Sequence, residues 1–280
     1  RKVSYSMLIG PPGHGKTTAF KQAAKIVSKA LELRYIEKPV LGEHVDINCF
    51  VLTVVNLAGE VSKSTLSGLP SAESDAQGRR YTSMLPSYGM RALQRAGGGI
   101  LLLDDLTNAS EFIQNIALPL TDENTFNELK LQNVYVGITA NMGALDGTST
   151  SAMSSALRNR VKPVFVEDTV EDFISRARKT NNDEIGDAYI CDFLLQDKSR
   201  FISPLPKKDQ MGGYATPRSL DNFITVARRH IYDNGGKGVG ELKATEILDN
   251  DAKSMLGIDL GNDYSTYLAA IRTHAEPLAK

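Results

Sequence analysis

The chain has 280 residues, a formal net charge of −1 and a hydrophobic fraction of 41%. Its length allows one large or two smaller cores, and its balanced charge gives no sign of a chain-wide attraction to nucleic acid or to an acidic membrane. The composition excludes a membrane-spanning helix, because no apolar stretch approaches the roughly 20 residues required, and no signal peptide is visible. We therefore expect a cytoplasmic protein without a membrane partner.

The two cysteines, Cys49 and Cys191, lack the spacing of metal ligands. Buried free thiols in a reducing compartment are the expected state of such a pair. The chain begins at Arg1 and enters a predicted strand within a few residues, so we expect that a preceding segment belongs to the protein.

The first predicted strand, over 3–9, leads into the glycine-rich sequence Gly-Pro-Pro-Gly-His-Gly-Lys-Thr at 10–17. The pattern Gly-x-x-x-x-Gly-Lys-Thr between a strand and a helix is typical of a phosphate-binding loop, and an ordinary glycine turn is the competing interpretation. A helix is predicted to follow over 16–33. Its predicted buried face consists of Phe20, Ala23, Ala24, Val27, Ala30 and Leu31.

Each residue type in this loop has a chemical reason to be there. Gly13 and Gly15 let the backbone turn its N–H groups toward phosphate oxygens, and the helix directs its positive end to the same place. Lys16 supplies a cation for the β- and γ-phosphates, and the Thr17 hydroxyl is a ligand for Mg²⁺. The predicted nucleotide-binding residues are Gly10, Pro11, Pro12, Gly13, His14, Gly15, Lys16, Thr17 and Thr18.

Strands and helices alternate over the following part of the chain. This alternation predicts a parallel sheet with helices on both faces. Residues 58–88 have no periodic pattern, and a connection of that length is usually functional or mobile. Strands are predicted over 48–57, 100–105, 134–140 and 162–166, and helices over 90–96, 109–120 and 154–159.

Three of these strands end in polar residues, which the carboxyl edge of a parallel sheet would bring together. Asp104 is suited to hold Mg²⁺, and Asp105 to act as general base or to orient the attacking water. Asn141 follows a strand that we expect between the other two, where its amide can bond the γ-phosphate or the attacking water, although a turn-initiating Asn is a common alternative. Asn56 either bonds the catalytic acid or caps its strand.

The pattern changes after Glu167, where no further buried strand is predicted. We expect an α/β nucleotide-binding domain over 1–168 and a helical domain over 169–280. Arginines near the boundary and in the second part, Arg160 and Arg218, are of the residue type that neutralises charge on a transferring phosphoryl group. Helices are predicted over 169–179, 184–196, 217–233, 240–256 and 263–276.

Five segments together resemble the AAA+ ATPases in order and spacing. They are Gly-Pro-Pro-Gly-His-Gly-Lys-Thr, Leu-Leu-Leu-Asp-Asp, Ile-Thr-Ala-Asn, Ala-Leu-Arg-Asn-Arg-Val and Ala-Thr-Pro-Arg-Ser-Leu. Gly-Leu-Pro at 68–70 and Asp-Leu-Thr-Asn-Ala at 105–109 resemble the MoxR-type, dynein-related branch, which includes many small bacterial and phage ATPases. The resemblance covers about 1–233. It implies a P-loop NTPase core with a parallel sheet flanked by helices, followed by a small all-α lid.

The resemblance also implies roles for the matched residues, with ATP and Mg²⁺ as cofactors. Residues 10–17 correspond to Walker A, which includes Lys16 and the metal ligand Thr17. Asp104, as metal ligand, and Asp105 correspond to Walker B. Most of the family has Glu in place of Asp105, so slow hydrolysis or a water-bridged base is implied.

Three further positions correspond to elements that sense or complete the site. Asn141 corresponds to sensor 1, and Arg218 to sensor 2 on the helical lid. Arg160 corresponds to the arginine finger that reaches into a neighbouring subunit, with Arg158 as the alternative. The implied catalytic set is Lys16, Asp105, Asn141, Arg160 and Arg218.

The function implied by the resemblance is an ATP-driven ring, with six copies expected, that remodels a client protein. In this branch the client is often a von Willebrand factor A-type partner or a metal-cofactor enzyme. A nucleic-acid motor or loader is the alternative, for which Arg79-Arg80-Tyr81 and Arg228-Arg229-His230 supply local basic patches. A slow, nucleotide-gated switch is a third hypothesis, motivated by Asp105.

The branch inserts a helix or hairpin before the Walker B strand, and residues 58–88 are where this insert is expected. Such inserts line a pore or touch the partner, and an unstructured loop is the competing interpretation. The sequence does not identify the client, and it favours ATP over GTP only through the family.

Overall fold

The computed structural model describes residues 5–58, 64, 68–123, 125–126, 129–181, 189–201, 213–233 and 245–275. The chain forms two compact units. The first takes the chain up to Pro11 together with Lys16–Val166, and the second takes Pro12–Gly15 together with the chain from Glu167 onward. Each unit has a hydrophobic core of its own.

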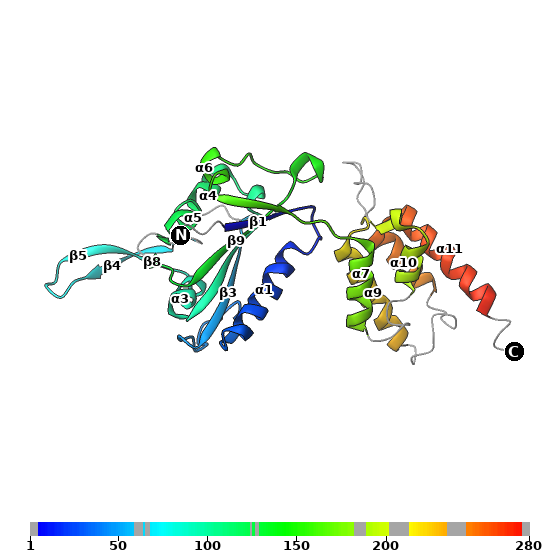
Figure 1. Cartoon of the computed structure of the whole chain (residues 1–280), viewed down its shortest axis with the longest axis horizontal. Helices are drawn as coiled ribbons and strands as arrows, with labels where there is room; N and C mark the ends of the chain where they lie inside the picture. Colours follow the sequence, from blue (N-terminus) through cyan, green and yellow to red (C-terminus); the bar gives the residue numbers. More distant parts are fainter. Residues whose placement is uncertain are drawn as a thin grey trace. The chain divides into compact units, whose positions relative to one another are not determined.

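A six-stranded sheet forms the centre of the first unit (Figure 1). All of its neighbouring strands are parallel, so their carboxyl ends meet at one edge. The prediction that the strand before Asn141 lies between the first strand and the strand of Asp104 is confirmed. In spatial order the strands are β10 (Val161–Phe165), β1 (Tyr5–Ile9), β9 (Val134–Ala140), β6 (Gly98–Asp104), β3 (Cys49–Asn56) and β2 (Arg34–Glu37).

Both faces of the sheet are covered because its strands carry apolar side chains on both sides. In β6, Leu101 and Leu103 belong to the larger core, whereas Ile100 and Leu102 pack with Phe20 of α1 (Lys16–Ala30). The other helical segments of the first unit are α3 (Tyr88–Arg95), the 3₁₀ turn η1 (Leu106–Asn108), α4 (Glu111–Ile116), α5 (Leu120–Glu123), the 3₁₀ turn η2 (Gly143–Leu145) and α6 (Ser155–Arg158).

Helix α1 lies close to the sheet because one strand residue has no side chain. A Cβ atom on Gly137 of β9 would overlap the Phe20 ring. The helix buries Phe20, Ala24 and Ser28, which recur every four residues. Of the predicted buried face, Phe20 and Ala24 are buried as expected, whereas Ala23, Val27, Ala30 and Leu31 are exposed. The helix thus packs along a narrower line than predicted.

The end of α1 also differs from the prediction of a helix over 16–33. Glu32 takes a left-handed conformation with φ of 56°, and the N–H of Leu33 donates to the carbonyl of Ser28 at 2.9 Å. This reversal ends the helix, and Leu31 stays 55% exposed although it was predicted to be buried. The chain then enters β2, a four-residue edge strand that was not predicted because two of its four residues are charged.

A continuous helix over 109–120 was predicted and is not present. Asp105 is left-handed and starts η1, and α4 begins only after Ser110, whose hydroxyl accepts a hydrogen bond from the N–H of Ile113 at 3.4 Å. In α4, Ile113 is buried whereas Phe112 is 64% exposed. A small ribbon of β7 (Thr125–Phe126) and β8 (Leu129–Lys130) was also not predicted.

The predicted insert before the strand of Asp104 contains an antiparallel hairpin, formed by β4 (Leu69–Ser74) and β5 (Arg80–Leu85). Figure 1 shows it reaching away from the sheet of the first unit. In its turn, Asp75 accepts hydrogen bonds from the backbone N–H groups of Gln77 and Arg79 at 2.9 Å. Over 69–85 the insert is therefore a hairpin and not an unstructured loop. Residues 59–63 and 65–67 of the predicted insert lie outside the described residues.

The described part of the second unit is helical. Its core contains the fully buried rings of Phe193, Phe223 and Tyr264, whose edge-to-face contacts have centroid distances of 5.2 and 5.5 Å. The predicted starts at 184 and 240 lie outside the described residues. The helical segments are α7 (Val170–Asn181), α8 (Ile190–Gln196), η3 (Lys198–Phe201), α9 (Pro217–Asp233), α10 (Thr245–Leu256) and α11 (Ile258–Ala275).

The expected fold class, a parallel-sheet P-loop core flanked by helices and followed by a helical region, is confirmed. Cys49 and Cys191 are buried and form no disulfide, as predicted. Over the described ranges, no helix combines the length and the apolar character needed to cross a bilayer.

Candidate active site

The glycine-rich loop begins where β1 ends. The N–H of Gly10 donates to the carbonyl of Ala140 at 3.3 Å, which ties the start of the loop to the neighbouring strand. Gly13 and Gly15 have φ values of 84° and 72°, a conformation that residues with a side chain rarely adopt. The two glycines therefore allow the turn that the sequence predicted.

Lys16 is the first residue of α1, and its ammonium group points back toward the loop. Its Nζ atom donates to the carbonyls of Gly10 at 2.6 Å and Pro11 at 2.8 Å, and to Oδ1 of Asn141 at 2.8 Å. The residue is only 6% exposed. These three acceptors hold the ammonium group at the carboxyl edge of the sheet.

Asp104 is held between two hydroxyl groups. Its Oδ1 atom accepts from Thr17 at 2.8 Å and from Thr139 at 2.6 Å. Thr139 is completely buried, and its hydroxyl also accepts from the backbone N–H of Asp105 at 2.8 Å. Thr139 was not predicted as a site residue, although a hydroxyl residue in an otherwise apolar strand was a signal for it.

Thr17 and Asp104 meet the chemical requirements of a magnesium site. Mg²⁺ prefers oxygen ligands, and it usually takes only one or two from the protein while nucleotide phosphates and water complete its shell. The Thr17 hydroxyl and the Asp104 carboxylate are such a pair. Within the described ranges, no group of three or more His, Cys, Asp or Glu residues is placed to hold a metal ion.

Asp105 leaves β6 in a left-handed conformation with φ of 57°. Such a conformation is uncommon for a residue other than glycine, and it directs the chain into η1. The Oδ1 atom of Asp105 accepts from the side-chain amide of Asn141 at 3.3 Å. The carboxyl group that the sequence predicted as general base therefore lies one hydrogen bond from Asn141.

Asn141 connects the two halves of the cluster and is 9% exposed. Its Oδ1 accepts from Lys16, and its Nδ2 donates to Asp105 and to Oδ1 of Asn108 at 2.7 Å. A turn-initiating Asn would bond its own following backbone, whereas this amide bonds side chains far away in sequence. Asn108 was not predicted as a site residue.

Asn56 is the last residue of β3 and is paired with Asp104 in the parallel register of the sheet. Asn56 accepts a hydrogen bond from the backbone N–H of Ala58 at 2.9 Å, which fits the strand-capping alternative. His14 is buried, at 4% exposure, and Thr18 is exposed on the first turn of α1.

Arg160 precedes β10, so it lies at the amino edge of the sheet, opposite the edge that carries Asp104 and Asn141. The register pairs Val161 with Tyr5 at the beginning of β1, and five strand residues span about 16 Å. The Nη1 atom of Arg160 donates to the carbonyl of Ala156 at 2.8 Å. Arg158 ends α6 and is exposed.

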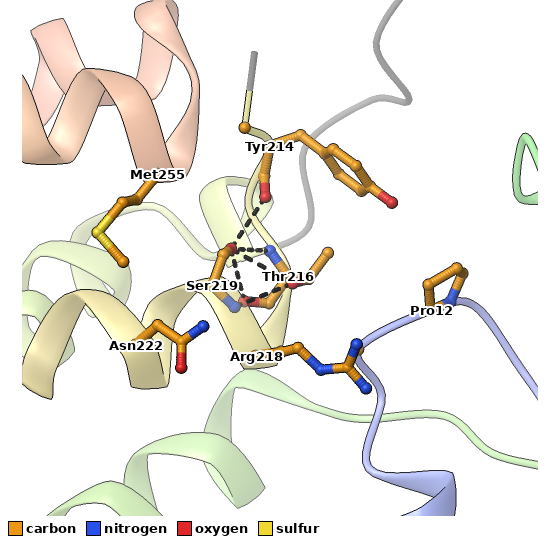
Figure 2. Close-up of a pocket in the computed structure, with 9 residues that line it drawn as sticks. Pro12, Tyr214, Thr216, Arg218, Ser219, Asn222 and Met255 are labelled. Carbon is orange, nitrogen blue, oxygen red and sulfur yellow. Dashed lines mark hydrogen bonds between the residues drawn. The ribbon is translucent and has the colours of Figure 1, made fainter. Parts of the chain in front are cut away.

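Arg218 belongs to the second unit, on the first turn of α9. The turn before it is a reciprocal cap, because the N–H of Thr216 donates to the Ser219 hydroxyl at 2.9 Å and the N–H of Ser219 donates to the Thr216 hydroxyl at 3.1 Å. Figure 2 shows the Arg218 guanidinium group directed toward Pro12.

A pocket of about 270 Å³ lies within this second unit. The absence of a side chain at Gly13 lets the loop pack closely against Thr216 and Arg218. A Cβ atom at Gly13 would lie 3.0 Å from the Thr216 hydroxyl oxygen and 3.3 Å from Cβ of Arg218. The lining residues are Pro12, Gly13, Gly213, Tyr214, Thr216, Arg218, Ser219, Asn222 and Met255.

No known protein family and no curated protein matches the sequence. Among solved structures, two mutants of RuvB from Thermotoga maritima are 16% and 18% identical, with TM-scores of 0.45 and 0.42. Each match covers 84% of this chain and 57% of the RuvB chain. NtrX from Brucella abortus is 16% identical with a TM-score of 0.41, over 84% of this chain and 48% of its own.

This chain therefore spans little more than half the length of the RuvB structures. The TM-scores are too low for these similarities to support a function. The functional interpretation rests on the strand order and on the contacts among Lys16, Thr17, Asp104, Asp105 and Asn141.

Proposed function

We propose that the chain is an ATP-hydrolysing, Mg²⁺-dependent subunit of the AAA+ type. The observation that carries this proposal is the convergence of Lys16, the Thr17–Asp104 pair and the Asn141–Asp105 pair at the carboxyl edge of one parallel sheet. A cation, a metal-ligand pair and a carboxylate at this position are the parts that phosphoryl transfer to water requires.

Each part has a defined task in this proposal. Lys16 would exchange its carbonyl partners for β- and γ-phosphate oxygens, while the loop N–H groups and the N-terminus of α1 bind the same oxygens. Thr17 and Asp104 would hold Mg²⁺, which neutralises phosphate charge when bound. Asp105 would accept a proton from the attacking water or orient that water, and the amide of Asn141 would bond the water or the γ-phosphate.

The identity of Asp105 bears on the rate. An Asp carboxylate lies one methylene nearer its own backbone than the carboxylate of Glu, which most of the resembled family has here. The slow, nucleotide-gated switch is therefore a variant of this proposal. Replacing Asp105 with Glu separates the two, because faster turnover in that variant would assign the slow rate to the shorter side chain.

We further propose that copies of the chain assemble head to tail into a ring, with six copies as in the resembled family. The placement of Arg160 at the amino edge supports this assembly, because that edge lies about 16 Å from the chain's own Asp104 edge. In the ring, Arg160 would complete the site of the neighbouring subunit, with Arg158 as the alternative. Arg218 would act as the sensor of the helical lid.

The work of the ring would be the remodelling of a client protein, as in the MoxR-type branch, where von Willebrand factor A-type partners are common. The exposed hairpin β4–β5 supports a role in contacting such a partner, because most of its residues are exposed. The domain division at 168/169 and the role of 169–280 as a lid belong to the same proposal.

A nucleic-acid motor is the second candidate, and one observation favours it. Arg80 and Tyr81 are exposed on the hairpin, where a cation and an aromatic ring suit backbone and base contacts. The formal charge of −1 counts against it.

ATP turnover with Mg²⁺ tests the proposal and separates the candidates. The wild-type chain should hydrolyse ATP, and Lys16→Ala should lose this activity because the phosphates lose their cation. Turnover that is indifferent to Lys16→Ala would contradict the proposed site. Strong stimulation by single- or double-stranded DNA would replace the protein client with nucleic acid as the partner.

A further inference from the structure

Asn108, in the turn η1, makes a close side-chain contact with the predicted sensor residue Asn141. Its Oδ1 atom accepts from Nδ2 of Asn141 at 2.7 Å, a shorter distance than the 3.3 Å from the same Nδ2 to Asp105. The Nδ2 atom of Asn108 donates to the carbonyl of Ser149 at 3.1 Å. The amides of Asn141 and Asn108 thus form a relay from Lys16 to the backbone at Ser149.

Donor and acceptor chemistry gives this relay one direction. The ammonium group of Lys16 can only donate, so it must face the oxygen of the Asn141 amide and not its nitrogen. The nitrogen of Asn141 must then donate, and it requires an acceptor from Asn108. The nitrogen of Asn108 is left to donate to a carbonyl, which Ser149 supplies. Each amide orientation therefore depends on the next.

A second side chain of the same turn, that of Thr107, holds the backbone of Asn141. The Thr107 hydroxyl accepts from the N–H of Asn141 at 3.0 Å and donates to the carbonyl of Asn141 at 3.2 Å. The Thr107 carbonyl accepts from the N–H of Ser151 at 2.7 Å. With its backbone fixed by Thr107, the main freedom left to Asn141 is rotation of its side-chain amide, and Asn108 is placed to restrict this rotation.

We propose that Asn108 is a positioning residue for hydrolysis, acting through Asn141. It holds the Asn141 amide with its oxygen toward Lys16 and its nitrogen toward Asp105, which is the orientation that the attacking water would meet. This role rests on the proposed ATPase function. The relay ends at Ser149, in the segment that leads to α6 and Arg160, so the amide orientation is anchored to that segment.

The test compares kcat with nucleotide affinity in Asn108→Ala and in Asn108→Leu, which keeps the branched shape of the side chain and lacks hydrogen-bonding groups. Asn115→Ala is the matched control, because Asn115 is an exposed Asn on the nearby helix α4. The stoichiometry of ATP binding, measured by calorimetry, gives the number of folded sites, and kcat is expressed per folded site. A lower kcat per folded site therefore cannot arise from partial unfolding of the variant.

The proposal predicts that kcat falls about tenfold in both Asn108 variants, the equivalent of one lost hydrogen bond, while the ATP Kd stays within about twofold. The Asn115→Ala control should match wild type. The proposal is overturned if kcat per folded site stays within about twofold of wild type, or if affinity falls as much as kcat. If the wild-type chain shows no ATP turnover that depends on Lys16, the proposed ATPase function is overturned, and the positioning role of Asn108 is overturned with it. This outcome is distinguishable from a failure of the Asn108 role alone, in which wild-type turnover is present.

Discussion

At the scale of single residues, Thr139 has a position that few substitutions would preserve. Its hydroxyl donates to Asp104 and accepts from the N–H of Asp105, so one atom orients both acids. Such outer partners of metal ligands fix ligand orientation, and their loss typically costs activity and metal affinity.

Thr139→Val keeps the shape of the side chain and removes its hydroxyl. We expect the Mg²⁺ concentration that supports half-maximal turnover to rise about tenfold or more, because Asp104 loses an orienting bond. Thr139→Ser keeps the hydroxyl and should behave nearly as wild type. Equal Mg²⁺ dependence in the Val and Ser variants would remove Thr139 from the site.

The sequence predicts which residues carry charge at this site better than it predicts the residues that orient them. Lys16 follows from the loop and the acids Asp104 and Asp105 from the strand that they end, and the uncharged Asn141 follows from its place after a strand. Thr139 lies within its strand and Asn108 within a segment predicted as a connection, so neither was marked by a position at the end of a strand. Their contacts join β9 to β6 and η1, so they exist only once the strand order brings these elements together.

At the scale of elements, the packing of α1 on the sheet depends on the absence of a side chain at Gly137. A Cβ atom there would overlap the Phe20 ring, so the helix that begins with Lys16 would have to move. Overpacking of this kind costs about 1–3 kcal/mol.

Gly137→Ala should therefore lower the free energy of unfolding by about 1–3 kcal/mol, measured by denaturant titration. Phe20→Leu should lower it as well, because the smaller side chain loses buried area. The loss of unfolding free energy in the double variant should be smaller than the sum of the losses in the two single variants, because Leu at position 20 relieves the overlap with Ala at position 137. Additive losses would show that the two positions do not interact.

The contact between α1 and the edge strand β2 includes an ion pair that depends on pH. Lys21 Nζ lies 2.7 Å from Glu37 Oε1, and the hydrogen bond from Lys21 lowers the pKa of Glu37. A carboxyl group with a lowered pKa in the folded state stabilises the protein above its unfolded pKa, and this contribution is lost as the pH falls through the folded pKa.

Glu37→Gln should remove this part of the acid dependence. Because both side chains are about one-third exposed, the expected loss is below about 1 kcal/mol at neutral pH, and it should shrink toward zero below pH of about 4. Lys21→Met should produce the same change in slope. A loss that is equal at neutral and acidic pH would contradict an electrostatic origin.

The predicted helices differ from the observed ones where local packing and turn geometry determine the buried face or the helix ends. The buried face of α1 was predicted only in part, because Phe20 and Ala24 are buried as expected but the next buried residue is the small Ser28 and not Val27. The helix predicted over 109–120 is divided between α4 and α5, where the N–H groups of Ala117 and Leu118 donate to the carbonyls of Gln114 and Asn115 in tight turns that the sequence pattern does not indicate. Long apolar strands such as β6 and β9 were predicted nearly to the residue.

At the scale of the whole molecule, the proposal requires that each site be completed by another copy. The sheet separates Arg160 from the Asp104 edge of its own subunit. A head-to-tail arrangement brings the amino-edge arginine of one copy to the nucleotide site of the next, and closure of such contacts gives a ring.

Mixing two inactive variants tests this arrangement. Lys16→Ala removes the loop cation and Arg160→Ala removes the proposed finger, so each variant alone should have little activity. In a random equal mixture, about one quarter of head-to-tail sites combine an intact Lys16 with an intact Arg160, and turnover should recover to about that fraction of wild type. A mixture as inactive as its components would contradict the shared site, and the same test with Arg158→Ala checks the alternative.

The central claim is that the cluster around Asp105 hydrolyses the nucleotide that the loop binds. The most direct measurement is ATP turnover alongside ATP affinity in Asp105→Asn, which keeps the side-chain size and cannot take up a proton. We expect turnover to fall by about 100-fold or more while the Kd for ATP changes little, because Lys16 and Thr17 are intact. Unchanged turnover in Asp105→Asn would contradict the account.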